Sequence, residues 1–196
     1  MKSRIIFLLL SAAILAGAFA LSGRLESGED APAQSGDEVT IAVATDLHYI
    51  APELTDKGDY FTNLVTDADG KVMLYIDELV RAFAAQIIAE QPDALILSGD
   101  LSFNGETASH EALASILSEV EASGVPVYVM PGNHDMNSSM AARFEGDGYE
   151  RVSSPSEGEF AQIYYEFGYS EAISRDEKSL SYAAQLAPGL RLVMLD

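Results

Sequence analysis

The chain has 196 residues, 48% of them hydrophobic, and a formal net charge of −20, because 31 Asp and Glu outnumber 11 Lys and Arg. This length supports one ordinary domain, and so acidic a surface repels the phosphate backbone, which argues against a role in coating nucleic acid. The chain has no cysteine, so disulfides, thiolate metal sites and cysteine nucleophiles are excluded, and any metal must be bound by nitrogen and oxygen.

The N-terminal segment has the pattern of an export signal. Lys2 and Arg4 precede an apolar run over 5–21, and the tripeptide at 18–20 has the small-x-small form that precedes a cleavage site. The same run is at the short limit for spanning a bilayer, so an uncleaved membrane anchor is the alternative. We expect residues 1–20 to be a signal peptide or membrane anchor of an exported protein, either secreted or held in the cell envelope.

The rest of the chain shows a linker followed by alternating strands and helices. Residues 21–38 are rich in Gly, Ser, Ala and acidic side chains, which predicts a flexible acidic linker. Short apolar or β-branched runs predict strands, and apolar residues at three- and four-residue steps predict helices. The expected elements are a strand over 39–44, a loop over 50–70, a helix over 71–90, a strand over 94–97, a helix through 113–120 that ends at Gly124, a strand over 125–130, a short helix over 159–165, and strands over 180–186 and 190–195.

The alternation of strands and helices favours an α/β fold. It predicts parallel strands with right-handed crossovers and helices covering the sheet, in one domain over 39–196. The carboxyl ends of parallel strands lie on one edge of the sheet, where α/β proteins bind ligands.

Polar side chains follow each of the first three expected strands. Imidazole nitrogen and carboxylate oxygen suit divalent Zn, Mn, Fe, Co or Ni. Two such ions clamp the attacking and leaving oxygens of an in-line displacement at phosphorus, and a carboxylate must bridge them. The residues are Asp46 and His48 after the first strand, Asp100 after the second, and Asn133, His134 and Asp135 after the third.

At these residues the sequence resembles the calcineurin-like metallophosphoesterase superfamily, whose pattern is D-x-H, then G-D, then G-N-H followed by D or E, and later a lone His and G-H-x-H. The match covers 39–135 well and 191–196 more loosely. The resemblance implies the N-terminal part of a four-layer α/β/β/α metallophosphoesterase fold, here incomplete. It also implies a metal-dependent hydrolase of phosphate mono- or diesters, with a small phosphorylated substrate.

The resemblance also implies roles for the residues that match the motifs. Asp46 and His48 would bind the first of two divalent ions. Asp100 would bridge the two ions, and Asn133 would bind the second through its amide oxygen.

The two residues that follow would act on the substrate. The resemblance implies that His134 stabilises or protonates the leaving oxygen. Asp135 would hydrogen-bond the imidazole of His134.

The sequence departs from the family pattern in its histidines. Only three are present, so the later lone His and both histidines of G-H-x-H are absent. His110 is expected to be a first-turn helix residue and not a ligand. We therefore expect the 196-residue chain to be a truncated sequence that is inactive or nearly so by itself.

Two other functions are left open by the residues. A non-catalytic exported binding module with the same fold is the main alternative, and a stop codon directly after Asp196 would favour it. A downstream Gly-His-x-His would favour the enzyme. A serine hydrolase is a poor third, since Ser98 and Ser102 lie in no nucleophile-elbow motif.

Overall fold

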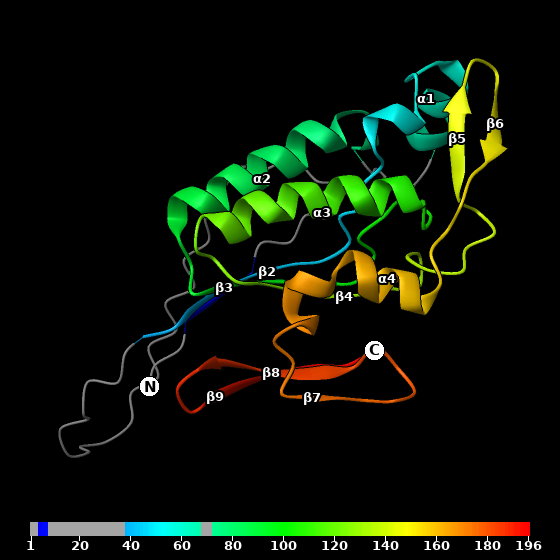
Figure 1. Ribbon diagram of the computed structural model, residues 1–196. Helices are drawn as coiled ribbons and strands as arrows, with labels where there is room; N and C mark the ends of the chain where they lie inside the picture. The colour runs from blue at the N-terminus through cyan, green and yellow to red at the C-terminus, as the bar shows by residue number, and fades with distance from the viewer. Residues whose placement is uncertain (1–3, 8–37, 68–71) are drawn as a thin grey trace.

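The computed structural model in Figure 1 describes residues 4–7, 38–67 and 72–196. The predicted signal or anchor (1–20) and linker (21–38) therefore lie largely outside the described residues. Residues 4–7, expected outside the domain, form strand β1 (Arg4–Phe7) beside β2. An open strand edge pairs readily with an apolar segment. That pairing does not bear on whether the segment is removed, so the export signal stays a prediction.

A parallel sheet forms the centre of the fold. Its strand order is β1-β2-β3-β4, and each neighbouring pair is parallel, as expected for the strands after 39. Buried apolar residues fill it, and Leu95, Leu97, Val127 and Val129 are fully buried. The strands are β2 (Thr40–Ala44), β3 (Ala94–Ser98) and β4 (Val127–Met130).

Helices α2 (Ile76–Glu90) and α3 (Thr107–Ala122) lie together over one face of this sheet (Figure 1). The helix expected from 71 begins as a 3-10 turn, η2 (Met73–Tyr75). It ends where Gln91 adopts a left-handed conformation before Pro92, a residue that disfavours a preceding helical residue. Gly124 has φ of 98° just beyond α3, as expected of a helix C-terminus.

The segment expected as a loop over 50–70 contains ordered structure. It forms η1 (Pro52–Leu54) and α1 (Asp59–Thr66), and α1 buries Phe61 and Val65. Helix α1 packs on a hairpin that was not expected, β5 (Ala142–Glu145) with β6 (Gly148–Arg151). Phe61 and Phe144 have ring centroids 5.1 Å apart. The expectation of a loop was therefore wrong at 52–54 and 59–66, whereas 56–58 has no regular secondary structure.

A second, antiparallel sheet lies on the side of the parallel sheet opposite α2 and α3 (Figure 1). The hydroxyl of Tyr182 in this sheet donates to the Val129 carbonyl of β4 at 3.0 Å. The order helices, sheet, sheet is consistent with an incomplete metallophosphoesterase fold. The antiparallel sheet consists of β7 (Ser174–Arg175), β8 (Tyr182–Ala187) and β9 (Leu190–Met194). It is preceded in the chain by α4 (Glu157–Ile163) and the irregular turn η3 (Tyr165–Tyr169).

Within the described ranges, no helix has both the length and the apolar character needed to cross a membrane. The apolar run over 5–21 falls outside those ranges except at residues 5–7.

Candidate metal centre

The loops that follow β2 and β3 run side by side at the carboxyl edge of the parallel sheet. The amide of Asp46 donates to the Gly99 carbonyl at 3.1 Å, and that of His48 donates to the Asp100 carbonyl at 2.9 Å. Tyr49 continues the pairing by donating to Leu101 at 2.9 Å. These backbone bonds bring side chains from two distant parts of the sequence to one place.

Three residues in these loops have a left-handed backbone. The φ angles of Asp46, His48 and Asp100 are 56°, 46° and 48°. Such a conformation costs a non-glycine residue about 1–3 kcal/mol and persists only where the surrounding structure imposes it. Three such residues in one cluster indicate a site whose side-chain directions are fixed at some cost in stability.

Two glycines allow the loops after β3 and β4 to approach. A Cβ on Gly132 would lie 2.2 Å from Asp100 Oδ1 and 2.3 Å from the Asp100 amide nitrogen. A Cβ on Gly99, whose φ is 89°, would lie 3.1 Å from the Gly132 Cα. Residues without a side chain fit here, because any Cβ would meet the neighbouring loop.

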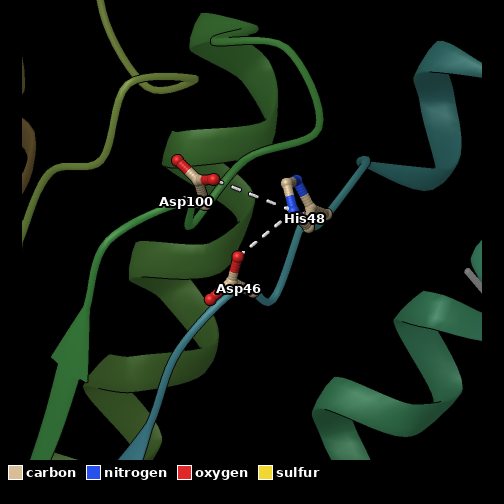
Figure 2. Close-up of side chains that lie close together, drawn as sticks. All are labelled: Asp46, His48 and Asp100. Atoms are coloured by element: carbon tan, nitrogen blue, oxygen red, sulfur yellow. Dashed lines mark ion pairs between the residues drawn. The ribbon is translucent and has the colours of Figure 1, made fainter. Parts of the chain in front are cut away.

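Asp46, His48 and Asp100 direct their polar atoms toward one another (Figure 2). His48 Nε2 lies 3.7 Å from Asp46 Oδ1 and 3.9 Å from Asp100 Oδ2. One ligand atom from each residue falls within 4.8 Å of the others. The side chains of His48 and Asp100 are 9% and 17% exposed, whereas that of Asp46 is 55% exposed, so the cluster opens to solvent on the Asp46 side.

This donor set fits a divalent ion. The imidazole and carboxylates are too far apart to hydrogen-bond one another. Donors of a common ion with bonds of about 2.0–2.2 Å lie at most about 4.2 Å apart. The two pairs that include His48 satisfy that limit, and the three ligand atoms together fall within 4.8 Å. The structure brings these three residues together in a possible metal-binding group, and their role as metal ligands stays a prediction.

His134 lies beside this group. Its ring centroid is 5.3 Å from that of His48, with the planes at 85°, and its backbone amide donates to Asp100 Oδ1 at 3.2 Å. Asn133 is exposed and immediately precedes it. The loop after β4 therefore joins the site through His134, and the roles of Asn133 and His134 as ligand and catalyst stay predictions.

Asp135 has a different partner from the one expected. No hydrogen bond to the imidazole of His134 is found in the described part of the chain. Its buried carboxylate instead accepts from the amides of Leu101 at 3.1 Å, Ser102 at 2.8 Å and Gly132 at 2.7 Å. The Ser102 hydroxyl adds a bond of 2.8 Å. Asp135 thus fastens the loop after β4 to the loop after β3.

His110 lies in the first turn of α3, as expected, and belongs to no metal-binding group among the described residues. It is fully buried, and burial lowers the pKa of its imidazole, an effect that the nearby Asp135 carboxylate partly opposes. Its ring contacts Asp135 and Tyr164. The sequence alone did not predict that His110 contacts Asp135, nor that the Ser102 hydroxyl donates to the Asp135 carboxylate. The position of Ser102, two residues after Asp100, was the signal that could have pointed to it.

Comparison with known proteins agrees with this geometry. A probable cyclic nucleotide phosphodiesterase of Synechococcus is 32% identical over 104 residues, which is 52% of this chain and 34% of that protein. Another of Rhodopseudomonas palustris is 38% identical over 71 residues, 35% of this chain and 25% of that protein. The matched segments therefore span about a third or less of these relatives' lengths. The family model of the calcineurin-like phosphoesterases matches residues 39–184, and the chain belongs to that family.

Proposed function

We propose that this protein is a hydrolase of phosphate mono- or diesters that uses two divalent metal ions. The observation that carries the proposal is the meeting of Asp46, His48 and Asp100 from two loops of a phosphoesterase fold. When bound, two such ions neutralise charge on the phosphoryl oxygens and lower the pKa of water, so that hydroxide is available for in-line attack. The ions would be drawn from Mn, Fe, Zn, Co and Ni.

The proposed ligands can be assigned to the two ions. Asp46 and His48 would hold the first. Asp100 would bridge both, because one of its carboxylate oxygens faces His48 while the other accepts the His134 amide. The amide oxygen of Asn133 would contribute to the second ion.

His134 would act on the substrate. Its amide bond to Asp100 and its ring contact with His48 hold it at the rim of the metal-binding group. An imidazole in that place can stabilise charge on the leaving oxygen or donate a proton to it. Asp135 would contribute by holding the loop that carries His134.

The chain supplies few imidazoles for two ions. It has three histidines, and His110 is buried with both ring nitrogens already engaged. We therefore propose that the 196-residue chain by itself binds one ion better than two and hydrolyses esters slowly or not at all. Full activity would need donors that these residues do not include.

A phosphodiester is the preferred substrate class, because both relatives are named as probable cyclic nucleotide phosphodiesterases. A small phosphorylated substrate fits the strongly acidic chain, since bound cations dominate the local charge at a metal site. The apolar run over 5–21 supports export, with secretion or membrane association as its outcome.

Calorimetric titration with Mn²⁺ tests the metal site. The chain should bind the ion, and Asp100→Asn should weaken binding about a hundredfold or more, because the shared carboxylate loses its charge. Asp147→Asn, the same change at an exposed turn residue, should leave affinity unaltered. Equal affinity in the wild type and Asp100→Asn would overturn the proposed site.

A non-catalytic binding module is the second candidate, favoured by the short set of imidazole donors. Hydrolysis of bis-p-nitrophenyl phosphate or a cyclic nucleotide separates the two. Turnover by the chain, or by a longer gene product that contains it, should disappear with chelation and with Asp100→Asn. Metal binding without any such turnover would favour the binding module.

A further inference from the structure

We propose that His110 is a positioning residue, which holds the backbone of Asp135 and thereby fixes Asn133 and His134 against Asp100. The proposal rests on the proposed metal-dependent function. It is carried by a buried set of contacts outside the metal-binding group, which joins α3, the loop after β4 and the end of α4.

The contacts of His110 define its tautomer. Its Nε2 lies 2.8 Å from the backbone carbonyl oxygen of Asp135, which can only accept, so Nε2 carries the hydrogen. Its Nδ1 is then unprotonated and accepts from the hydroxyl of Tyr164 at 2.9 Å. Both side chains are fully buried. Because each ring nitrogen has one suitable partner, the ring cannot flip without losing buried hydrogen bonds, and protonation of Nδ1 would require the Tyr164 hydroxyl to accept instead of donate.

Asp135 is held at two points. Its carbonyl accepts from His110, and its carboxylate accepts from the loop after β3 and from the Gly132 amide. The His134 amide, in the same segment, donates to Asp100 Oδ1. A shift of the Asp135 backbone would therefore move His134 and Asn133 relative to the bridging carboxylate.

Tyr164 extends the support to α4. It directly follows that helix, and its ring centroid lies 4.7 Å from that of Phe160 and 5.6 Å from that of His110. The Phe160 ring lies 5.4 Å from His110 at 80°. Aromatic packing thus confines the imidazole to the orientation in which Nε2 meets the Asp135 carbonyl.

A matched pair of substitutions separates positioning from packing. In His110→Gln the side-chain amide nitrogen takes the place of Nε2 and can donate to the Asp135 carbonyl. In His110→Asn the amide is one carbon shorter and does not reach it. His110→Asn also lacks one buried carbon that His110→Gln keeps, so the effect of lost volume needs its own control. Val120→Ala removes volume at another fully buried position of α3 and serves as a further control.

The first readout is the affinity for Mn²⁺ in the full 196-residue chain. We expect His110→Asn to weaken binding about tenfold or more, as substitution of outer-shell partners of metal sites does. His110→Gln should stay within about threefold of the wild type, and Val120→Ala should match it. Equal affinities in the Asn and Gln variants would overturn the proposal.

The second readout is nuclear magnetic resonance of the histidine rings in metal-free protein. With three histidines in the chain, the substituted proteins report only His48 and His134. The ring signals of His134 should move in His110→Asn and stay near wild type in His110→Gln. In the wild type, the nitrogen shifts of His110 should identify the Nε2–H tautomer, and the opposite tautomer would overturn the proposal.

The two readouts also separate this proposal from the proposed function. If the wild type fails to bind Mn²⁺, the metal site is wrong. The His134 signals of the metal-free variants still decide whether His110 positions the loop.

Discussion

Asp46 combines a left-handed backbone conformation with a carboxylate that would bind the metal ion. Its φ is 56°, its side chain is more than half exposed, and a carboxylate oxygen lies within 4.8 Å of ligand atoms of His48 and Asp100. Without a bound cation, two carboxylates this close repel each other. The residue therefore favours ion binding at the expense of the stability of the metal-free chain.

Asp46→Asn separates these two effects. Asn adopts the left-handed conformation readily, so the backbone should be retained. We expect Mn²⁺ affinity to fall about tenfold or more, while the free energy of unfolding in chelator stays equal or rises by up to about 0.5 kcal/mol. Calorimetry and urea unfolding measure the two quantities. A large loss of stability in chelator would show that the carboxylate has a structural role.

Gly132 is where a single methyl group should damage the site. The added Cβ of Gly132→Ala would meet the side chain and backbone of Asp100, so one loop must move. We expect a loss of about 2 kcal/mol or more in unfolding free energy, together with weaker Mn²⁺ binding. Gly158→Ala is the control, because nothing lies within 4 Å of its added Cβ and the residue is in α4. That change should stabilise by about 0.5–1 kcal/mol.

Burial of His110 should make stability depend on pH. The unfolded imidazole has an ordinary pKa near about 6.5, and burial lowers the folded-state pKa. Below about 6.5 the unfolded chain therefore binds more protons than the folded chain, and stability falls as pH falls. His110→Gln removes this contribution, so the wild type should lose more unfolding free energy between about pH 7.5 and 5 than the variant does. Parallel pH profiles from urea unfolding would contradict the assignment.

The sequence was sufficient to place Asp46, His48 and Asp100 together, because strand ends in a parallel sheet share an edge. It was not sufficient to find the partner of Asp135. In the tight turn after β4 the Asp135 carboxylate accepts from backbone amides of the loop after β3 and not from the adjacent His134 imidazole. The path of that loop depends on packing with His110, which no local pattern reveals.

Among the elements, α4 has the clearest local determinant of its start. Ser156 and Glu159 form a capping box, in which the Glu159 carboxylate accepts a hydrogen bond from the Ser156 amide at 2.8 Å. The next residue, Phe160, is fully buried in the core. Ser156→Ala should cost about 1 kcal/mol in unfolding free energy. Ser139→Ala, at an exposed position outside any helix, should change it by less than about 0.5 kcal/mol. Equal values from urea unfolding would mean that tertiary packing, and not the cap, fixes α4.

Elements with a strong apolar period were predictable, and short ones were not. α2 and α3 follow from repeated apolar residues, and β3 and β4 from apolar runs. α1 was missed because glycines and acidic residues surround it, although Phe61 and Val65 lie four residues apart, as on one helix face. The β5–β6 hairpin was missed although Gly146 and Asp147 form its turn. Aromatic side chains pack between the two elements, with Tyr60 and Phe61 of α1 against Phe144 of β5.

On the scale of the whole molecule, burial of the apolar core and repulsion between surface charges have opposite effects on stability. The layers bury an apolar core, whereas the net charge of −20 makes the folded surface repel itself. Val193 of the antiparallel sheet and Leu195, which follows its last strand, are exposed in the described structure. Burial of the apolar core therefore stabilises the folded state, whereas repulsion between the acidic surface charges destabilises it, and salt can screen this repulsion.

Repulsion between the surface charges should weaken as salt is added. Screening lengths fall from about 30 Å at 0.01 M salt to about 8 Å at 0.15 M, a change that spans the distances between charges on one domain. With chelator present to exclude site binding, added sodium chloride over this range should raise the urea midpoint of unfolding. Glu150→Lys with Glu177→Lys, two exposed positions, makes the net charge less negative and should reduce the rise. A midpoint that falls with salt would mean that ion pairs such as Arg81 with Asp77 outweigh the self-repulsion.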